Sequence, residues 1–331
     1  MTTKPMSRLY EKISKAGFSR SFIRKVLPSW WDDSLADTPS GKQYASLHLA
    51  RVFSFSPESL KDGSESASFN LGGNHRFKHR VNLGEEDLNV ATAVAYSAAR
   101  IVAENFSIPF NPNAELNWQA VRDKLLSDKK WVDLASLIGF CHSLGIPVVY
   151  IKNFPTGAAK MAGLALSVSG RPVIVLTQAK THGFMLFDLA HELGHIALGH
   201  LNDLNGGVHV DRKIEAQSTN NLEVAANKSA FGLIGGKETL SIAPTRGYLT
   251  GEKLARAALV YGTQHCIEPT HVALNYGHNL GHWGVAVNAV KSICVGQPTD
   301  QSLARQLMMD AIDHENINDD DLELLTTLCG V

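Results

Sequence analysis

Residues 191–195, His-Glu-Leu-Gly-His, constrain this chain more than any other stretch. They lie in an apolar, proline-free run, residues 183–199, which is the pattern of a buried helix. Residues four apart share one face of a helix, so His191 and His195 can reach a single ion. Glu192 points about 100° around the helix, beside that ion, where a general base for a metal-bound water would lie.

This motif is specific, because 14 histidines and 15 glutamates in 331 residues give a chance match roughly 0.03 times. The alternative is an amphipathic core helix whose histidines are only hydrogen-bonded. Both interpretations predict a buried helix, and the small residues Ala190 and Gly194 would let another element pack closely against it.

A catalytic zinc site normally has three protein ligands and one water. His200 is the nearest further histidine, but it lies nine residues after His191 and so on the opposite side of a continuing helix. The metzincin spacing is also absent, because Leu198 and Leu201 occupy its glycine and histidine positions. We therefore interpret His200 as a residue at the helix end.

Glu223 is the better third ligand. Residues 221–231 predict a second helix, with Glu223, Ala226, Asn227 and Ala230 on one face. Glu223 would complete a two-histidine, one-carboxylate site for Zn²⁺, and Mn²⁺ could use the same ligands. Without the upstream motif, a solvated helix charge would be the preferred interpretation of this glutamate. Asn227, one turn further on, is a candidate for hydrogen-bonding support of the ligands.

The charge and the cysteines limit the possible functions less than the His-Glu-x-x-His motif does. The net charge of −1 argues neither for nor against a nucleic-acid partner. The distribution is uneven, because residues 1–80 carry 13 Lys and Arg against 7 Asp and Glu, whereas residues 300–331 carry 1 against 8. No signal peptide or membrane-spanning run is predicted. The four cysteines form no Cys-x-x-Cys pair, so a reducing cytoplasm is the expected compartment.

The N-terminal residues 1–63 predict a domain of short helices, over 9–13, 19–27 and 40–53. Gly17 and Ser19 mark the first break, and short basic helices of this kind resemble a helix-turn-helix domain. DNA contact and protein docking are both open for this domain. Residues 64–84 predict a linker, whose basic stretch 75–80 could contact phosphates.

The central part, residues 85–236, predicts helices at 88–106, 118–126 and 131–144, followed by strands at 148–151, 162–169 and 173–176. A mobile loop is predicted over 202–220. Residues 237–331 predict a helical C-terminal domain, where His278 and His282 are more simply surface or core histidines than a second metal site. Its acidic tail suits a helix docked on the body or on a basic partner. The predicted fold class is α+β, mostly helical, with a small sheet packed on the metal helix.

Four segments resemble a known family: Leu-Gly-Ile-Pro-Val at 144–148, Gly-Arg-Pro-Val-Ile-Val-Leu at 170–176, the motif with its flanks at 187–198, and Glu-Val-Ala-Ala-Asn-Lys-Ser-Ala at 223–230. They resemble the metallopeptidases named after ImmA and IrrE, over a third of the chain. The resemblance implies a zincin-like peptidase domain in which His191, His195 and Glu223 bind the metal and Glu192 is the catalytic base.

We therefore expect a zinc-dependent endopeptidase. By resemblance, its substrate is a helix-turn-helix repressor or an antitoxin. Two other classes stay open. One is a regulator that binds DNA or a partner protein and keeps the peptidase fold as a scaffold, and the other is a metallohydrolase that acts on a small substrate.

Overall fold

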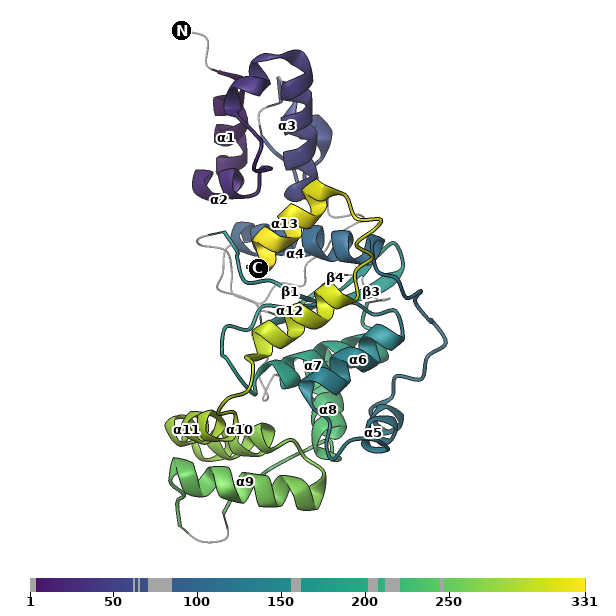
Figure 1. Ribbon diagram of the computed structural model, residues 1–331, viewed down its shortest axis with the longest axis vertical. Helices are drawn as coiled ribbons and strands as arrows, with labels where there is room; N and C mark the ends of the chain where they lie inside the picture. Colours follow the sequence, from purple (N-terminus) through teal and green to yellow (C-terminus); the bar gives the residue numbers. More distant parts are fainter. Residues whose placement is uncertain are drawn as a thin grey trace.

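The computed structural model describes residues 4–61, 63–64, 66–70, 85–155, 162–201, 208–211, 221–244 and 247–330. Most of the predicted linker, including its basic stretch 75–80, lies outside these residues, as does most of the predicted loop 202–220. The molecule is long, with the N-terminal helices at one end and the helices of residues 251–293 at the other (Figure 1). The predicted metal helix lies between these ends.

The N-terminal end consists of the predicted short helices. Gly17, with a φ of +100°, separates the first two. The hydroxyl of Ser19 accepts a hydrogen bond from the backbone N–H of Phe22 at 3.3 Å, as a helix N-cap does. Phe69, in the predicted linker, packs against Phe55 with ring centroids 4.8 Å apart. The elements are α1 (Pro5–Lys15), α2 (Arg20–Lys25), η1 (Asp33–Asp37), α3 (Pro39–Val52) and η2 (Pro57–Leu60).

The described strands form a mixed sheet in the order β1-β3-β2-β4. Three of them lie where they were predicted: β1 (Val148–Tyr150), β2 (Gly163–Val168) and β3 (Arg171–Leu176). β4 (Val208–Asp211) falls in the predicted loop, and the loop prediction is wrong at these four residues. β4 pairs antiparallel with β2, a partner about 40 residues earlier in the chain. Local sequence does not reveal such a distant pairing.

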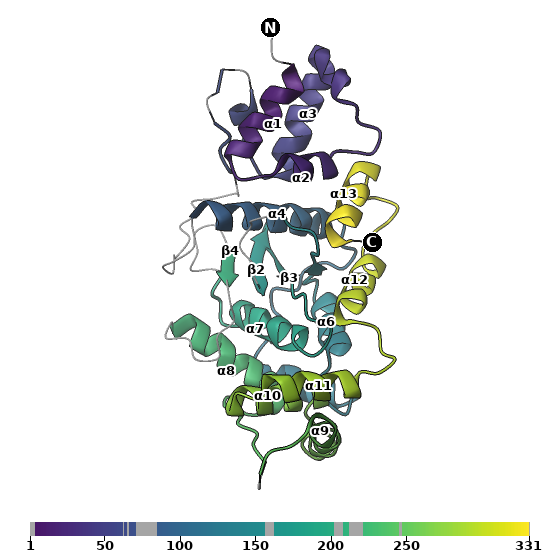
Figure 2. The ribbon, with the colours of Figure 1, turned by 90° about the vertical axis from the view of Figure 1, so that its left-hand side faces the viewer.

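Helices cover both faces of the sheet. α4 (Glu85–Glu104) lies along one face, and α6 (Leu134–Ser143) and α7 (Met185–Ala197) lie on the other (Figure 2). α6 begins at Leu134 rather than at the predicted residue 131, because the Asp133 carboxylate accepts the backbone N–H of Ser136 and caps the helix. α5 (Trp118–Leu126), which has its predicted bounds, and α8 (Asn221–Gly235) complete this layer.

The C-terminal part is helical, as predicted. α9 (Gly251–His265), α10 (Pro269–Leu280) and α11 (Trp283–Ile293) pack together at the end of the molecule. α12 (Asp300–Asp310) and α13 (Asp319–Cys329) then return towards the sheet and the N-terminal helices (Figure 1).

The acidic tail is docked on the body. Asp321 of α13 pairs with Arg51 at 2.6 Å, and Asp320 accepts the Tyr44 hydroxyl at 2.6 Å. Both partners lie on α3, so the tail helix neutralises part of the basic N-terminal region of the same chain.

Two clusters of buried residues lie on opposite sides of the sheet. Val149 and Val175 face one cluster, which includes the N-terminal helices, α4 and α13. Val148 and Ile174 face the other, which includes α5 to α11. The first cluster draws on all four predicted segments, 1–63, 64–84, 85–236 and 237–331, and the second on the last two. The boundaries of these segments stay a prediction.

The predicted α+β class is confirmed, with a small sheet packed on the metal helix. In the described part of the chain, no helix combines the length and apolarity needed to cross a bilayer.

Candidate metal centre

α7 and α8 pack closely enough to bring their side chains to one point. A Cβ atom added at Gly194 would lie 3.2 Å from the Ala226 carbonyl oxygen and 3.2 Å from the Cβ of Ser229. A larger residue would push the helices apart, so the close packing predicted for Gly194 is confirmed. The contact also explains the small Ser229 on α8, because it faces the glycine.

His191, His195 and Glu223 converge at this contact. The Nε2 atoms of the two histidines are 3.0 Å apart, and they lie 3.3 and 3.7 Å from the two carboxylate oxygens of Glu223. Nitrogen and oxygen ligands at 2.0–2.1 Å from a tetrahedral Zn²⁺ are about 3.3 Å from one another. The donor set and its spacing therefore fit such an ion. Within the described residues, this is the one group of three metal-ligating side chains.

The site is enclosed. Both histidines have no exposed surface, and Glu223 is 9% exposed. A carboxylate buried between two imidazoles is costly unless a cation offsets its charge. Glu223 also lies in the first turn of α8, where the helix dipole favours a negative charge.

Glu192 lies against the start of β2. A Cβ atom at Gly163 would be 2.5 Å from Oε1 of Glu192 and 2.8 Å from its Cγ. A side chain at position 163 would displace this carboxylate, so Gly163 leaves the space that the predicted base occupies. The role of Gly163 was not predicted, because its neighbour Glu192 is 29 positions later in the chain.

The family comparison covers these residues. Residues 141–257 match the model of the IrrE N-terminal-like domain, a family of M78 peptidases. This segment is similar to an IrrE N-terminal-like domain. It runs from the end of α6 into α9 and contains all four predicted site residues. The comparisons with curated proteins and with solved structures found no match. They did not confirm the predicted helix-turn-helix likeness of the N-terminal region.

His200 contacts the candidate metal centre through His195. Its Nδ1 is 2.7 Å from Nδ1 of His195, and it is 5% exposed. A histidine that binds a metal through Nε2 carries its proton on Nδ1, so His195 would donate and His200 would accept. The left-handed Gly199, with a φ of +73°, turns the chain back at the helix end. His200 is thus at the helix end, as predicted, and also contacts a candidate ligand, which we did not predict.

Replacing His200 by alanine is expected to lower the zinc affinity about 10- to 100-fold, because the ring of His195 loses its partner. Competition against a chromophoric chelator would measure this. His278→Ala is the matched control, since His278 is exposed and distant from the ligands in sequence. An unchanged affinity in His200→Ala would show that this contact does not orient the ligand.

A series of hydrogen bonds connects the first turns of α7 to the loop before it and to α12. Asp188 is buried one turn before His191 and accepts a hydrogen bond from the Gln178 amide at 3.1 Å. Burial raises the pKa of Asp188 to about 6, while the Gln178 hydrogen bond and the charge of His191 oppose this rise. Gln301 of α12 in turn donates to the backbone carbonyl of Gln178 at 2.9 Å. The loop before the metal helix is therefore held from both sides.

Asn227 and three histidines of the C-terminal part lie outside the group of three candidate ligands. Asn227 is buried on α8, one turn after Glu223, and its supporting role stays a prediction. His278 is exposed and His282 contacts the Tyr248 ring at 4.6 Å, so neither forms a metal group with the other described residues. His271 is a core histidine whose pKa burial lowers to about 4.

Proposed function

We propose that this protein is a zinc-dependent endopeptidase that cleaves a partner protein. The observation that carries the proposal is the convergence of His191, His195 and Glu223 on one point, with Glu192 directly after the first ligand. The family match supports a peptidase-type function.

The residues of the candidate site would have different roles in the reaction. A zinc ion held by the three ligands would supply Lewis-acid polarisation and a water of lowered pKa. Glu192 would accept the proton of the attacking water and deliver it to the leaving amine. Gly163 leaves room for this carboxylate, and His200 contacts the ring of His195.

The substrate would be an extended segment of protein. β4 is one of the two edge strands of the described sheet and lies next to β2, whose first residue lies against Glu192. An unfolded peptide can add to such an edge as a further strand, with its backbone groups paired. The resemblance noted above favours a helix-turn-helix repressor or an antitoxin as the partner. We place the protein in the cytoplasm, in accord with its four free cysteines.

The test is to load the protein with zinc, determine bound metal by elemental analysis, and incubate it with the helix-turn-helix proteins encoded near its gene. Wild type should bind one zinc and cut one of them, as seen by mass spectrometry. Glu223→Ala should lose both properties. Glu238→Ala, which removes an exposed glutamate after α8, should retain both.

The absence of zinc binding after loading would overturn the proposal. Stoichiometric zinc without cleavage of any candidate would instead identify a binding protein built on a peptidase fold.

A further inference from the structure

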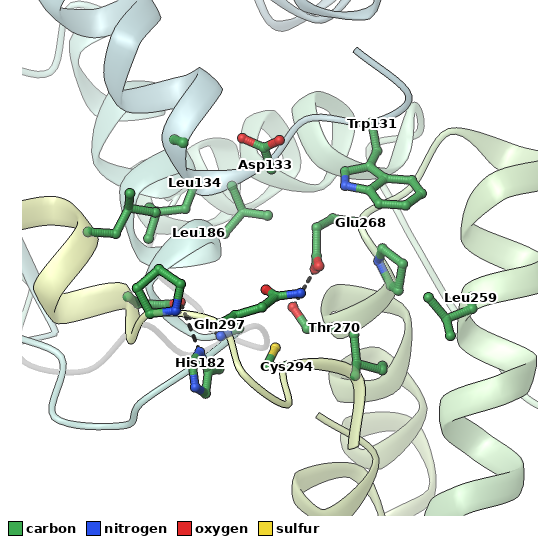
Figure 3. Close-up of a pocket in the computed structure, with 17 residues that line it drawn as sticks. Trp131, Asp133, Leu134, His182, Leu186, Leu259, Glu268, Thr270, Cys294 and Gln297 are labelled. Atoms are coloured by element: carbon green, nitrogen blue, oxygen red, sulfur yellow. Dashed lines mark hydrogen bonds and ion pairs between the residues drawn. The ribbon is translucent and has the colours of Figure 1, made fainter. Parts of the chain in front are cut away.

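A pocket of about 310 Å³ lies beside the first turn of the metal helix (Figure 3). It is formed where α6, α10 and α12 begin, and it includes Leu186 of α7. Of the described residues that line it, none is a predicted metal ligand or Glu192. It is therefore distinct from the metal centre, and its volume suits a small molecule.

The pocket is acidic. Asp133, Glu268 and Asp300 line it, and the described lining contains no lysine or arginine. The one imidazole in this lining belongs to His182, whose Nδ1 is 3.7 Å from Asp300 Oδ1. Figure 3 shows the side chains of Glu268 and Gln297 meeting near the middle of the drawn residues. A ligand in this space would face several carboxylates and few positive charges.

These carboxylates already accept hydrogen bonds from backbone N–H groups at or near the helix N-termini around the pocket. Asp133 accepts the backbone N–H of Ser136 at 2.7 Å, and Glu268 accepts that of His271 at 2.8 Å. Asp300 accepts the backbone N–H of Gly183, just before α7, at 2.8 Å. Helix N-termini attract anions, but these N-termini are already matched by protein carboxylates. These helix N-termini therefore do not favour an anionic ligand in the pocket.

Burial leaves the negative charge incompletely compensated. It raises the pKa of Asp300 to about 6. It also raises the pKa of Glu268, to which the nearby charge of Asp300 contributes. A cation in the pocket would stabilise both ionised groups.

The shape of the pocket favours an organic cation over a metal ion. In the described chain, the pocket's acids do not gather as a group of three metal-ligating side chains. The walls include the apolar side chains of Trp131, Leu186 and Leu259. An indole face attracts cations, and aliphatic walls suit a hydrocarbon body. Leu259 is 44% exposed, so the pocket is accessible from solvent.

We propose that this pocket is a second binding site, which takes a small amine or guanidine with a hydrocarbon body between Trp131 and the carboxylates of Glu268 and Asp300. The site does not depend on the proposed peptidase activity. Its ligand would be recognised by charge at one end and by apolar contact along the rest.

Calorimetric titration of the full-length, zinc-loaded protein tests this, with putrescine, spermidine, agmatine and tryptamine as probes. Asp300→Asn and Glu268→Gln each remove one charge but keep an oxygen that can cap the helix. Ala135→Phe narrows the exposed rim of the pocket and leaves every charge in place. Asp319→Asn is the matched control, because it removes an exposed acid from the first turn of α13. Glu223→Ala tests for binding to the metal centre, since amines can also coordinate zinc.

We expect at least one probe to bind one-to-one with a Kd below about 1 mM. The three pocket variants should each weaken binding at least about tenfold, which is the loss expected for one charged or packing contact. Asp319→Asn and Glu223→Ala should bind as wild type does. Thermal unfolding of each variant would show that it is folded.

Three results would overturn the proposal. The first is that none of the four probes binds. The second is binding that the pocket variants leave unchanged or that Glu223→Ala abolishes. The third is tighter binding of succinate, as an anion, or of Ca²⁺, as a metal ion, in the same pocket.

Discussion

Glu192→Gln is expected to lower the rate of substrate cleavage by a factor of about 100 to 10,000, which is the usual contribution of a general acid–base group. The amide cannot accept the water's proton, so the loss should appear in kcat. Zinc binding should remain, because Glu192 is not among the three converging donors. Glutamine also has nearly the same shape, so it should fit beside Gly163. Quantitative mass spectrometry of the cleaved partner would measure the rate.

Elemental analysis of the same samples separates chemistry from metal loss. Glu238→Gln, the same substitution at an exposed position, should have the wild-type rate. Cleavage by Glu192→Gln within about tenfold of wild type would assign the base to another residue.

Arg122→Met is expected to lower the free energy of unfolding by about 3–5 kcal/mol, because several carbonyls would lose a charged donor. The Arg122 guanidinium donates to the carbonyls of Leu233 and Ile234 at 2.9 and 2.6 Å, and to that of Cys266 at 2.8 Å. It thus binds the C-terminal ends of α8 and α9, whose partial negative charge favours a cation. Burial lowers the pKa of Arg122, and these carbonyls offset the cost of its charge.

Urea denaturation would measure the change. Lys253→Met, on the exposed surface of α9, should alter the free energy of unfolding by less than about 0.5 kcal/mol. Because α8 carries Glu223, the Arg122 variant should also bind zinc more weakly. A loss of stability below about 1 kcal/mol would show that the helix ends are held by other contacts.

Elements with strong local signals were predicted closely. α5 has its predicted bounds, because Asn117 caps its start by accepting the backbone N–H of Ala120 at 2.9 Å. The three predicted strands were found because β-branched runs ended by proline or glycine are distinctive. β4 was missed because its four residues become a strand only by pairing with β2.

Residues whose contacts lie far away in the sequence were also missed, because the local sequence does not reveal such contacts. Gly163 leaves room for Glu192, which lies against it. Arg122 binds backbone carbonyls because α8 and α9 end beside it. His200 was placed correctly at the helix end, yet its contact with His195 depends on the turn at Gly199.

The sequence by itself determined the candidate metal-binding face, because the four-residue spacing of His191 and His195 puts both imidazoles on one side of any helix. It also indicated the base, since the residue after the first histidine lies beside that face. Only the tertiary structure decided that Glu223 reaches this face. Helices α7 and α8 approach closely at Gly194, and that approach depends on packing between segments far apart in the chain. The acidic pocket beside α7 has the same origin, because it exists only where the starts of separate helices meet.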